Sequence, residues 1–215
     1  VVPLHELGSF DLTALKDSAT PLGPDIAVVY LNRVTDAQEE KGRNAFIESY
    51  RRYRPALAHQ FYVVNKGFAP EHLPIQYELF SEFAPRFIQV TDEGYDLTAY
   101  QTAAAFIEEP VVLFLNTYSE PLHEGWLEKL HDAFRSPGVG LAELAKPRDV
   151  HQSIGPTGFM IETERFRRLA ASPQLTGQGE AHRFEEGLAS LTRMVEAEKL
   201  TTTVVWKSAF SLLQN

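Results

Sequence analysis

Polar residues that could hold a small phosphorylated ligand follow three apolar segments of the chain. Asn32 and Arg33 come after the first segment, Asp92 after the second, and Asn116 and Ser119 mark the end of the third. In open α/β sheets, ligands bind beyond the carboxyl ends of the strands. If the three segments are parallel strands, these residues therefore gather at one edge of the sheet and form the rim of a binding site.

The apolar pattern predicts the elements that would position these residues. Val111–Leu115 is a continuous apolar run, too short for a helix and rich in β-branched residues, which is typical of a strand buried on both faces. Phe87–Val90 predicts an earlier strand. Between the two, Asp96 or Thr98 can cap a helix. The apolar stripe of that helix is formed by Leu97, Tyr100, Ala104 and Ile107. Strand, helix and strand together predict a βαβ unit.

The same alternation runs along most of the chain. Asp36 and Glu39 predict a capping box, which begins a helix that Pro55 ends. The other predicted strands are 25–31, 60–65, 139–142, 158–161 and 202–206, and the other predicted helices are 73–83, 124–135, 162–171 and 184–200. Alternating strands and helices predict an α/β fold, with an open, mostly parallel central sheet and helices on both faces.

Composition limits the class of protein. A chain of 215 residues with 44% hydrophobic residues is most simply one domain, spanning 1–215. Its net charge of −9 argues against nucleic acid as a partner, since phosphate backbones need a basic surface. No apolar run reaches the roughly 18 residues of a transmembrane segment, and the first seven residues do not resemble a signal peptide. We therefore expect a cytoplasmic protein.

The sequence lacks the motifs of dinucleotide-binding domains, P-loop hydrolases and α/β hydrolases. The turn at Tyr30–Thr35 contains no glycine, so the dinucleotide-binding pattern G-x-G-x-x-G is missing. Neither a P-loop nor the G-x-S-x-G turn of α/β hydrolases occurs. Nicotinamide and flavin cofactors, P-loop hydrolysis and serine-hydrolase chemistry are disfavoured.

Several short motifs together resemble GT-A glycosyltransferases of the family-2-like group. In chain order these are V-V-L-F-L-N-T-Y-S-E-P at 111–121, G-W-L-E-K-L at 125–130, G-V-G-L at 138–141, G-F-M-I-E at 158–162 and F-E-E-G at 184–187. The resemblance implies the fold of nucleotide-diphospho-sugar transferases, with a nucleotide-binding half at 25–119 and an acceptor-side half at 120–215. It implies a nucleotide-sugar donor such as a UDP-sugar, and a saccharide or lipid acceptor that the motifs do not specify. The nucleotide-binding residues that it implies are Leu31, Asn32, Arg33, Asp92, Asp96, Asn116 and Tyr118.

The metal-binding motif of that family is altered in this chain. The resemblance places an Asp-x-Asp motif where Asn116 and Tyr118 stand, so both carboxylates are absent. Mn²⁺ or Mg²⁺ would then be bound weakly, with Asn116 as a neutral ligand and only together with the nucleotide. Basic residues would have to stabilise the diphosphate. The candidates are Arg33, which is best placed, and Lys66, Lys146, Arg148 and Lys207.

The resemblance also implies an acidic catalytic residue at Glu185 or Glu186. An inverting transferase needs a general base that takes the proton of the acceptor hydroxyl. Two acids at the start of a helix also complement its dipole, so a purely structural role stays open. The same alternative applies to Asp96 as a helix cap and to Tyr100 as a core residue.

Three functions are compatible with these observations. The first is glycosyl transfer from a nucleotide sugar. The second is a catalytically inactive protein that kept the fold and the sugar-nucleotide site, which the altered Asp-x-Asp motif suggests. The third is a nucleotidylyltransferase, but such enzymes usually have a glycine-rich, basic turn after the first strand, and this chain does not.

Overall fold

The structure is a computed structural model that describes residues 24–144, 158–171, 191–205 and 210–212. In chain order its elements are β1 (Ile26–Asn32), α1 (Ala37–Arg52), β2 (Gln60–Lys66), α2 (Leu73–Phe80), β3 (Arg86–Val90), α3 (Asp96–Ala104), β4 (Val111–Leu115), β5 (Ser119–Pro121), α4 (Trp126–Phe134), β6 (Val139–Leu144), β7 (Gly158–Glu162), α5 (Thr163–Ala170), β8 (Thr201–Val205) and β9 (Phe210–Leu212). Residues 191–197 are also helical.

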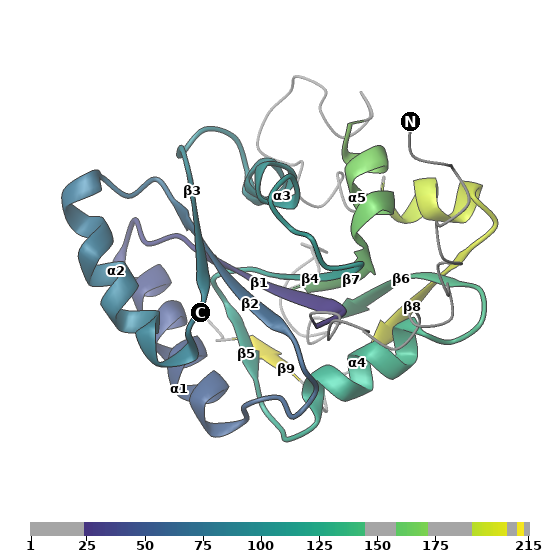
Figure 1. Cartoon of the computed structure of the whole chain (residues 1–215), viewed down its shortest axis with the longest axis horizontal. Coiled ribbons are helices and arrows are strands. Elements are labelled where there is room, and N and C mark those ends of the chain that lie inside the picture. The colour runs from purple at the N-terminus through teal and green to yellow at the C-terminus, as the bar shows by residue number, and fades with distance from the viewer. Residues whose placement is uncertain (1–23, 145–157, 172–190, 206–209, 213–215) are drawn as a thin grey trace, which may run out of the picture.

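Seven strands form one open sheet in the order β3-β2-β1-β4-β7-β6-β8 (Figure 1). The first four are parallel to one another, and β6 pairs in parallel with β8. Strand β7 lies between β4 and β6 and is antiparallel to both. The predicted mostly parallel α/β sheet is therefore confirmed, with one reversed strand. The carboxyl ends of β1 to β4 lie at the same edge.

Each face of the sheet is covered by a hydrophobic layer. Ala27, Val29 and Leu31 of β1 pack toward α3 and α5, whereas Val28 and Tyr30 pack toward α1, α2 and α4. Figure 1 shows these two groups of helices on opposite sides of the sheet. Because strand side chains alternate between faces, Asn32 at the end of β1 and Arg33 directly after it point to opposite faces of the sheet. This alternation decides which helix each of them meets.

Two predicted helix starts have different outcomes. Asp36 caps α1 as expected, because its Oδ1 accepts hydrogen bonds from the backbone N–H groups of Gln38 and Glu39. The carboxylate of Glu39 accepts from the N–H of Thr35 rather than from that of Asp36. The prediction that Asp96 or Thr98 caps α3 is wrong. Tyr95 occupies the cap position without a side-chain hydrogen bond, and Asp96 is the first helical residue.

A second, two-stranded sheet was not expected from the sequence. Strand β5 pairs antiparallel with β9, which brings the end of the described chain next to the turn after β4. The predicted helix at 184–200 is described only from residue 191 onward, and residues 1–23, 145–157 and 172–190 lie outside the described part of the chain. Within the described part, no helix is both long and apolar enough to cross a membrane.

The turn after β4 packs closely on α1. A Cβ at Gly42 would lie 2.9 Å from the carbonyl oxygen of Thr117 and 3.3 Å from the ring of Tyr118. The same carbonyl accepts a hydrogen bond from the hydroxyl of Tyr30, at 3.1 Å. The hydroxyl of Thr117 donates to the carbonyl of Leu31, at 2.9 Å. Thr117 thus joins the ends of β1 and β4, and Gly42 allows α1 to approach them.

Replacing Gly42 by alanine tests this contact. Alanine favours a helix over glycine by about 1 kcal/mol, but here its Cβ meets a backbone oxygen that must move. Since overpacking costs about 1–3 kcal/mol, we expect urea denaturation to show a net loss of up to roughly 2 kcal/mol of unfolding free energy. Lys41→Ala, at an exposed position of α1, is the control and should change it by less than about 0.5 kcal/mol. A stabilised Gly42→Ala variant would contradict this packing.

Candidate functional site

The predicted ligand-binding residues lie at one edge of the sheet. Asn32 ends β1, Lys66 ends β2, and Asp92 and Asn116 follow β3 and β4. The register pairs Asn32 with Asn65, so the ends of β1 and β2 lie side by side. Arg33 extends beyond the end of β1. Residues that are distant in sequence are therefore brought together as expected.

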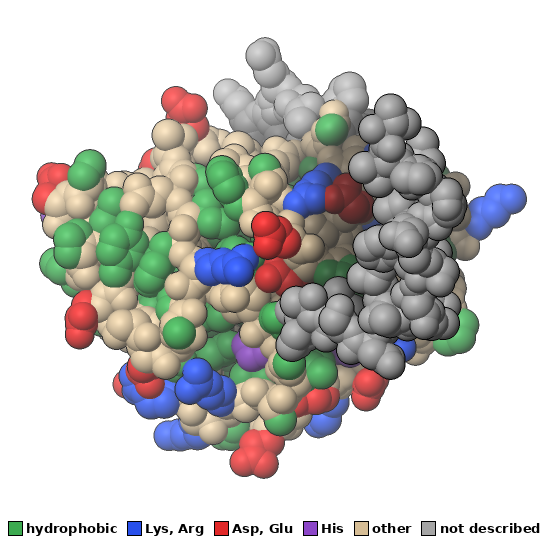
Figure 2. Space-filling model, viewed as in Figure 1, with side chains coloured by type: hydrophobic (Ala, Val, Ile, Leu, Met, Phe, Trp, Pro, Cys, Tyr) green, Lys and Arg blue, Asp and Glu red, His purple; other side chains and the backbone are tan. Residues whose placement is uncertain are grey.

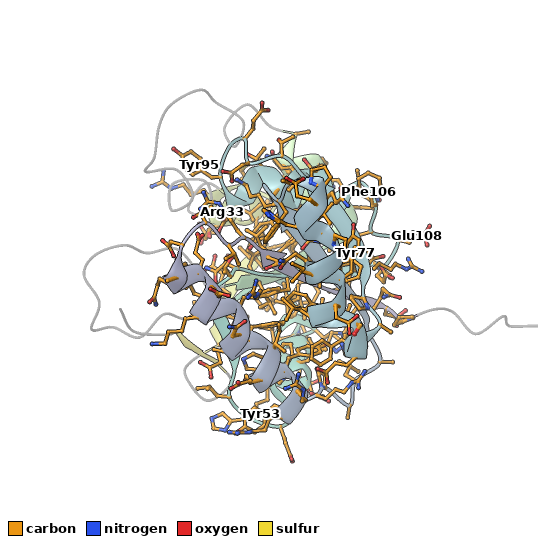
Figure 3. All side chains as sticks on the ribbon, turned by 90° about the vertical axis from the view of Figure 1, so that its left-hand side faces the viewer. Arg33, Tyr53, Tyr77, Tyr95, Phe106 and Glu108 are labelled. Carbon is orange, nitrogen blue, oxygen red and sulfur yellow. The ribbon has the colours of Figure 1, made fainter. Side chains whose placement is uncertain are left out.

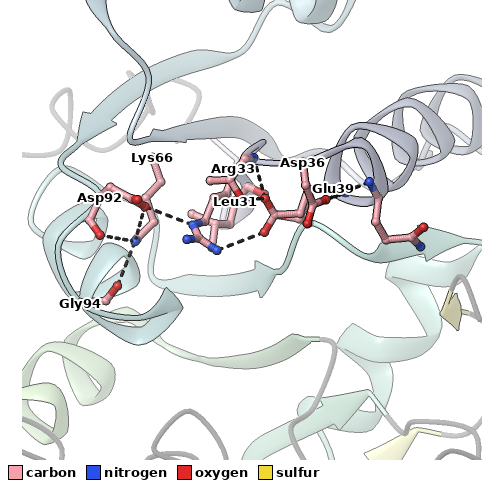
Figure 4. A network of polar contacts seen from close by, with 10 residues as sticks. Leu31, Arg33, Asp36, Glu39, Lys66, Asp92 and Gly94 are labelled. Carbon is pink, nitrogen blue, oxygen red and sulfur yellow. Dashed lines mark hydrogen bonds and ion pairs between the residues drawn. The ribbon is translucent and has the colours of Figure 1, made fainter. Parts of the chain in front are cut away.

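Three charged side chains form the centre of this edge (Figure 4). The carboxylate Oδ1 of Asp92 accepts hydrogen bonds from Arg33 Nε and from Lys66 Nζ, each at 3.1 Å. These hydrogen bonds, with Lys66 as the larger contribution, lower the pKa of Asp92. Asp92 is therefore ionised at neutral pH, and the two cations flank it.

Lys66 is buried, and the turn between β3 and α3 satisfies it. Its side chain is 1% exposed. Besides Asp92 Oδ1, its ammonium donates to the backbone carbonyls of Asp92, at 3.1 Å, and Gly94, at 2.9 Å. Gly94 has a φ of +66°, which glycine adopts without strain. An ammonium has three donors, so Lys66 is fully paired and positions this turn.

Arg33 connects the cluster to the start of α1. Its Nη1 donates to Glu39 Oε1 at 3.1 Å, while the other carboxylate oxygen of Glu39 accepts from the N–H and hydroxyl of Thr35. The side chain of Arg33 is 33% exposed, against 1% for that of Lys66. With Asp92 in place, Arg33 is therefore the more accessible cation of this pair.

A second group of polar side chains, three amides and one arginine, lies at the same strand ends but on the opposite face of the sheet. Asn32 Nδ2 donates to Asn65 Oδ1 at 2.8 Å and to Gln76 Oε1 at 3.1 Å, and Arg43 also donates to Gln76. All four residues are buried. Asn32 Oδ1 and Asn65 Nδ2 have no hydrogen-bond partner among the described residues. The edge thus has a charged cluster toward α3 and an amide cluster toward α1 and α2.

Asp96 is half-buried beside the charged cluster. Within the described residues its carboxylate accepts no hydrogen bond. Burial raises the pKa of Asp96, and the nearby charges of Lys66 and Arg33 act in the opposite direction without cancelling that effect. Tyr100 packs in the core, which was the alternative to a binding role. Tyr95 is 44% exposed, and Figure 3 shows it on the same side of the molecule as Arg33, away from Phe106 and Glu108.

Asn116 closes the turn after β4. Its Oδ1 accepts hydrogen bonds from the N–H of Tyr118, at 3.0 Å, and from the hydroxyl of Ser119, at 3.2 Å. Tyr118 is half-buried, and burial raises the pKa of its phenol. A neutral phenol is a poor metal ligand, and the amide oxygen is already engaged. Among the described residues, no group of three or more Asp, Glu and His side chains could hold a metal ion.

Several predicted residues lie outside the described chain. These are the predicted catalytic Glu185 and Glu186 and the basic candidates Lys146, Arg148 and Lys207. Leu31 is buried, and its carbonyl is bound by Thr117. The contributions of Glu39, Gln76 and Arg43 to the site were not predicted from the sequence. The sequence feature that could have indicated these three residues is a polar side chain on the side of a predicted helix that faces the strands.

No protein-family model matches the sequence, and no curated protein does. Solved structures do. The mannosyltransferase PcManGT of Pyrobaculum calidifontis, solved with GDP-Man and Mn²⁺, matches with a TM-score of 0.62 and 14% identity, over 89% of this chain and 57% of that one. Glucosyl-3-phosphoglycerate synthase of Mycobacterium tuberculosis, solved with Mn²⁺, UDP and glucosyl-3-phosphoglycerate, matches with a TM-score of 0.60 and 13% identity, over 90% of this chain and 73% of that one.

This chain has a GT-A fold. The 4-diphosphocytidyl-2C-methyl-D-erythritolsynthase of Anaerococcus prevotii also matches, with a TM-score of 0.59 and 10% identity, over 86% of this chain and 87% of that one. The GT-A fold is thus shared with glycosyltransferases and nucleotidyltransferases, and such low identities establish the fold alone. This chain spans little more than half of the mannosyltransferase.

Asp96→Asn should stabilise the protein at neutral pH. Because burial raises the folded-state pKa of Asp96, ionisation costs stability above that pKa, and the cost disappears as the pH falls through it. The amide removes the charge and keeps the shape. We expect a gain of roughly 0.5–2 kcal/mol in unfolding free energy near pH 7, which shrinks in acid.

Urea denaturation between pH 4 and pH 8 measures the effect of the Asp96 change. Glu93→Gln is the matched control, since Glu93 is exposed, lies in the same turn, and makes no ion pair or hydrogen bond among the described residues. Destabilisation of Asp96→Asn at pH 7 would mean that a partner holds the carboxylate.

Proposed function

We propose that this protein binds a nucleotide-diphosphate sugar, with a UDP-sugar as the first candidate, and transfers the sugar to a saccharide or lipid acceptor. The observation that carries the proposal is the meeting of Arg33, Asp92 and Asp96 at the carboxyl edge of a GT-A sheet. Ligands bind at this edge in open α/β sheets. Two solved structures of similar fold hold GDP-Man or UDP with Mn²⁺.

The available side chains suggest separate roles within the site. Arg33 has a planar donor fork and partial exposure, so it is the proposed contact for the diphosphate. Among the described residues, nothing donates a hydrogen bond to the Asp96 carboxylate, so it would take hydrogen bonds from ribose hydroxyls. Tyr95 offers an exposed ring against which a base can stack. In this arrangement 25–119 holds the nucleotide, and 120–215 faces the acceptor.

The described residues at this edge do not fit a resident divalent cation. Asn116 uses its amide oxygen to close a turn, and Tyr118 is a neutral phenol. Mn²⁺ or Mg²⁺ would be held mainly by oxygens of the nucleotide itself, with Asn116 as at most a neutral partner. The diphosphate that leaves during sugar transfer would then depend on Arg33 for positive charge.

Glu185, or else Glu186, is the proposed general base of the transfer reaction. This assignment rests on the resemblance of F-E-E-G at 184–187 to the family motif. The second candidate function is a catalytically inactive protein that binds the sugar nucleotide. The engaged amide of Asn116 favours that alternative, because a transferase of this group normally has a carboxylate there.

Nucleotide binding tests the proposed function. Isothermal titration calorimetry and thermal shift with UDP, GDP and CDP should detect binding, with UDP as the first candidate. A ligand at 100 times its Kd stabilises the folded protein by about 2.7 kcal/mol. We expect the affinity to depend little on Mn²⁺, since no strong metal group was found in the described residues. No heat and no melting shift with any of the three nucleotides would refute a donor site at this edge.

Substitution of the two glutamates separates an enzyme from a binding protein. In a protein that hydrolyses or transfers a UDP-sugar, Glu185→Gln should keep nucleotide affinity and reduce turnover by roughly 10²- to 10⁴-fold. Glu186→Gln tests the alternative assignment, and the variant with the larger loss of turnover identifies the base. Equal turnover in the wild type and both variants would assign the glutamates a structural role. Binding without turnover in the wild type would favour the inactive alternative.

A further inference from the structure

Asp92 occupies a place suited to a ligand phosphate. Its Oδ1 lies 3.1 Å from both Arg33 Nε and Lys66 Nζ. A phosphate oxygen makes the same charge-assisted hydrogen bonds to guanidinium and ammonium groups. We propose that Asp92 is an internal competitor, which pairs with Arg33 and Lys66 in the free protein and is displaced by the diphosphate of the ligand. This inference rests on the proposed function.

The fold gives the side chain of Asp92 a defined position. A Cβ at Gly67 would lie 2.9 Å from Asp92 Cβ and 3.0 Å from its Cγ. Gly67 also has a φ of +77°, so both its backbone and its lack of a side chain suit this approach. Any larger residue at Gly67 would push the carboxylate away from the cations.

The Asp92 carboxylate can also move away from the two cations. The side chain of Asp92 is 51% exposed, so it can rotate into solvent. Lys66 would keep its hydrogen bonds to the carbonyls of Asp92 and Gly94, which are backbone groups. A phosphate oxygen would then replace Oδ1 alone, and Arg33 would turn its exposed donors to the ligand. The exchange requires one side-chain rotation.

The charge balance explains why Asp92 would matter for affinity. The positive charges of Arg33 and Lys66 are balanced by Asp92 and by Glu39, even before Asp96 is counted. Figure 2 shows acidic and basic side chains interspersed near the middle of the visible face, outside the part drawn in grey. Displacement of Asp92 therefore creates the local positive charge that a diphosphate needs.

Asp92→Asn tests the inference with inorganic pyrophosphate as the probe. The amide keeps the shape against Gly67 and an acceptor oxygen for both cations, but it competes without charge. We expect calorimetry to show an affinity gain of about tenfold or more, the size expected for a hydrogen bond to a charged group. Glu93→Gln removes one negative charge from the same turn without touching Arg33 or Lys66, and it should change the affinity by less than about threefold.

Several outcomes would overturn the inference. The first is an unchanged pyrophosphate affinity in Asp92→Asn. The second is a gain in affinity that is equally large in Glu93→Gln. The third is that neither the wild type nor Asp92→Asn binds pyrophosphate. A second test needs no variant. Carbon-detected NMR should show the pKa of the Asp92 carboxyl rising when pyrophosphate saturates the wild type, because its cations are taken and a negative charge is added. An unchanged pKa overturns it as well.

UDP as a parallel ligand distinguishes this inference from the proposed function. UDP that binds the wild type and Asp92→Asn equally well overturns the competitor role and leaves the nucleotide site standing. If UDP binds neither protein, both the inference and the proposed function are refuted. Tighter UDP binding to Asp92→Asn than to the wild type supports both.

Discussion

The burial of one charged side chain determines how the candidate site at the carboxyl edge of the sheet is arranged. An ammonium removed from water needs hydrogen-bond partners, and Lys66 finds all of them in the turn between β3 and α3. That requirement fixes the turn against the end of β2. It also brings Asp92 to Arg33 and places Asp96 at the start of α3. The loss of Lys66 would therefore disturb the whole edge rather than one contact.

Two carboxylates in the same turn show opposite electrostatic behaviour as a result. Asp92 faces both cations, and its pKa is lowered. Asp96 is half-buried and accepts no hydrogen bond from the described part of the chain, and burial raises its pKa. Such separation of neighbouring acids by their environments is typical of sites that bind or react.

Local sequence patterns were sufficient for most of the fold. Continuous apolar runs predicted the central strands, and Asp36 predicted the start of α1. The direction of β7 was not predictable, because a short buried run looks the same in a parallel and an antiparallel strand. The cap of α3 was misassigned because burial of Lys66 sets that turn, and this contact spans the sequence from 66 to 94. Pairing of β5 with β9 is equally nonlocal.

The sequence was sufficient to predict the position of the candidate site but not the contacts among its side chains. Strand ends located Arg33, Asp92 and Asn116, since parallel strands finish at one edge. The sequence could not reveal that Arg33 and Asp92 bind each other, because 59 positions separate them. Nor could it reveal that Asn116 is engaged by its own turn. Glu185 and Glu186 stay predictions.

An amide NMR titration of the wild-type protein with UDP tests the central claim most directly. If the carboxyl edge of the sheet is the nucleotide site, the largest shifts will come from Arg33, the segment 92–96 and the segment 116–118, which are distant in sequence and meet only at this edge. Residues at the opposite strand ends, such as Gln60 and Arg86, should not respond. Shifts centred on those opposite ends, or no shifts at saturating UDP, would contradict the account.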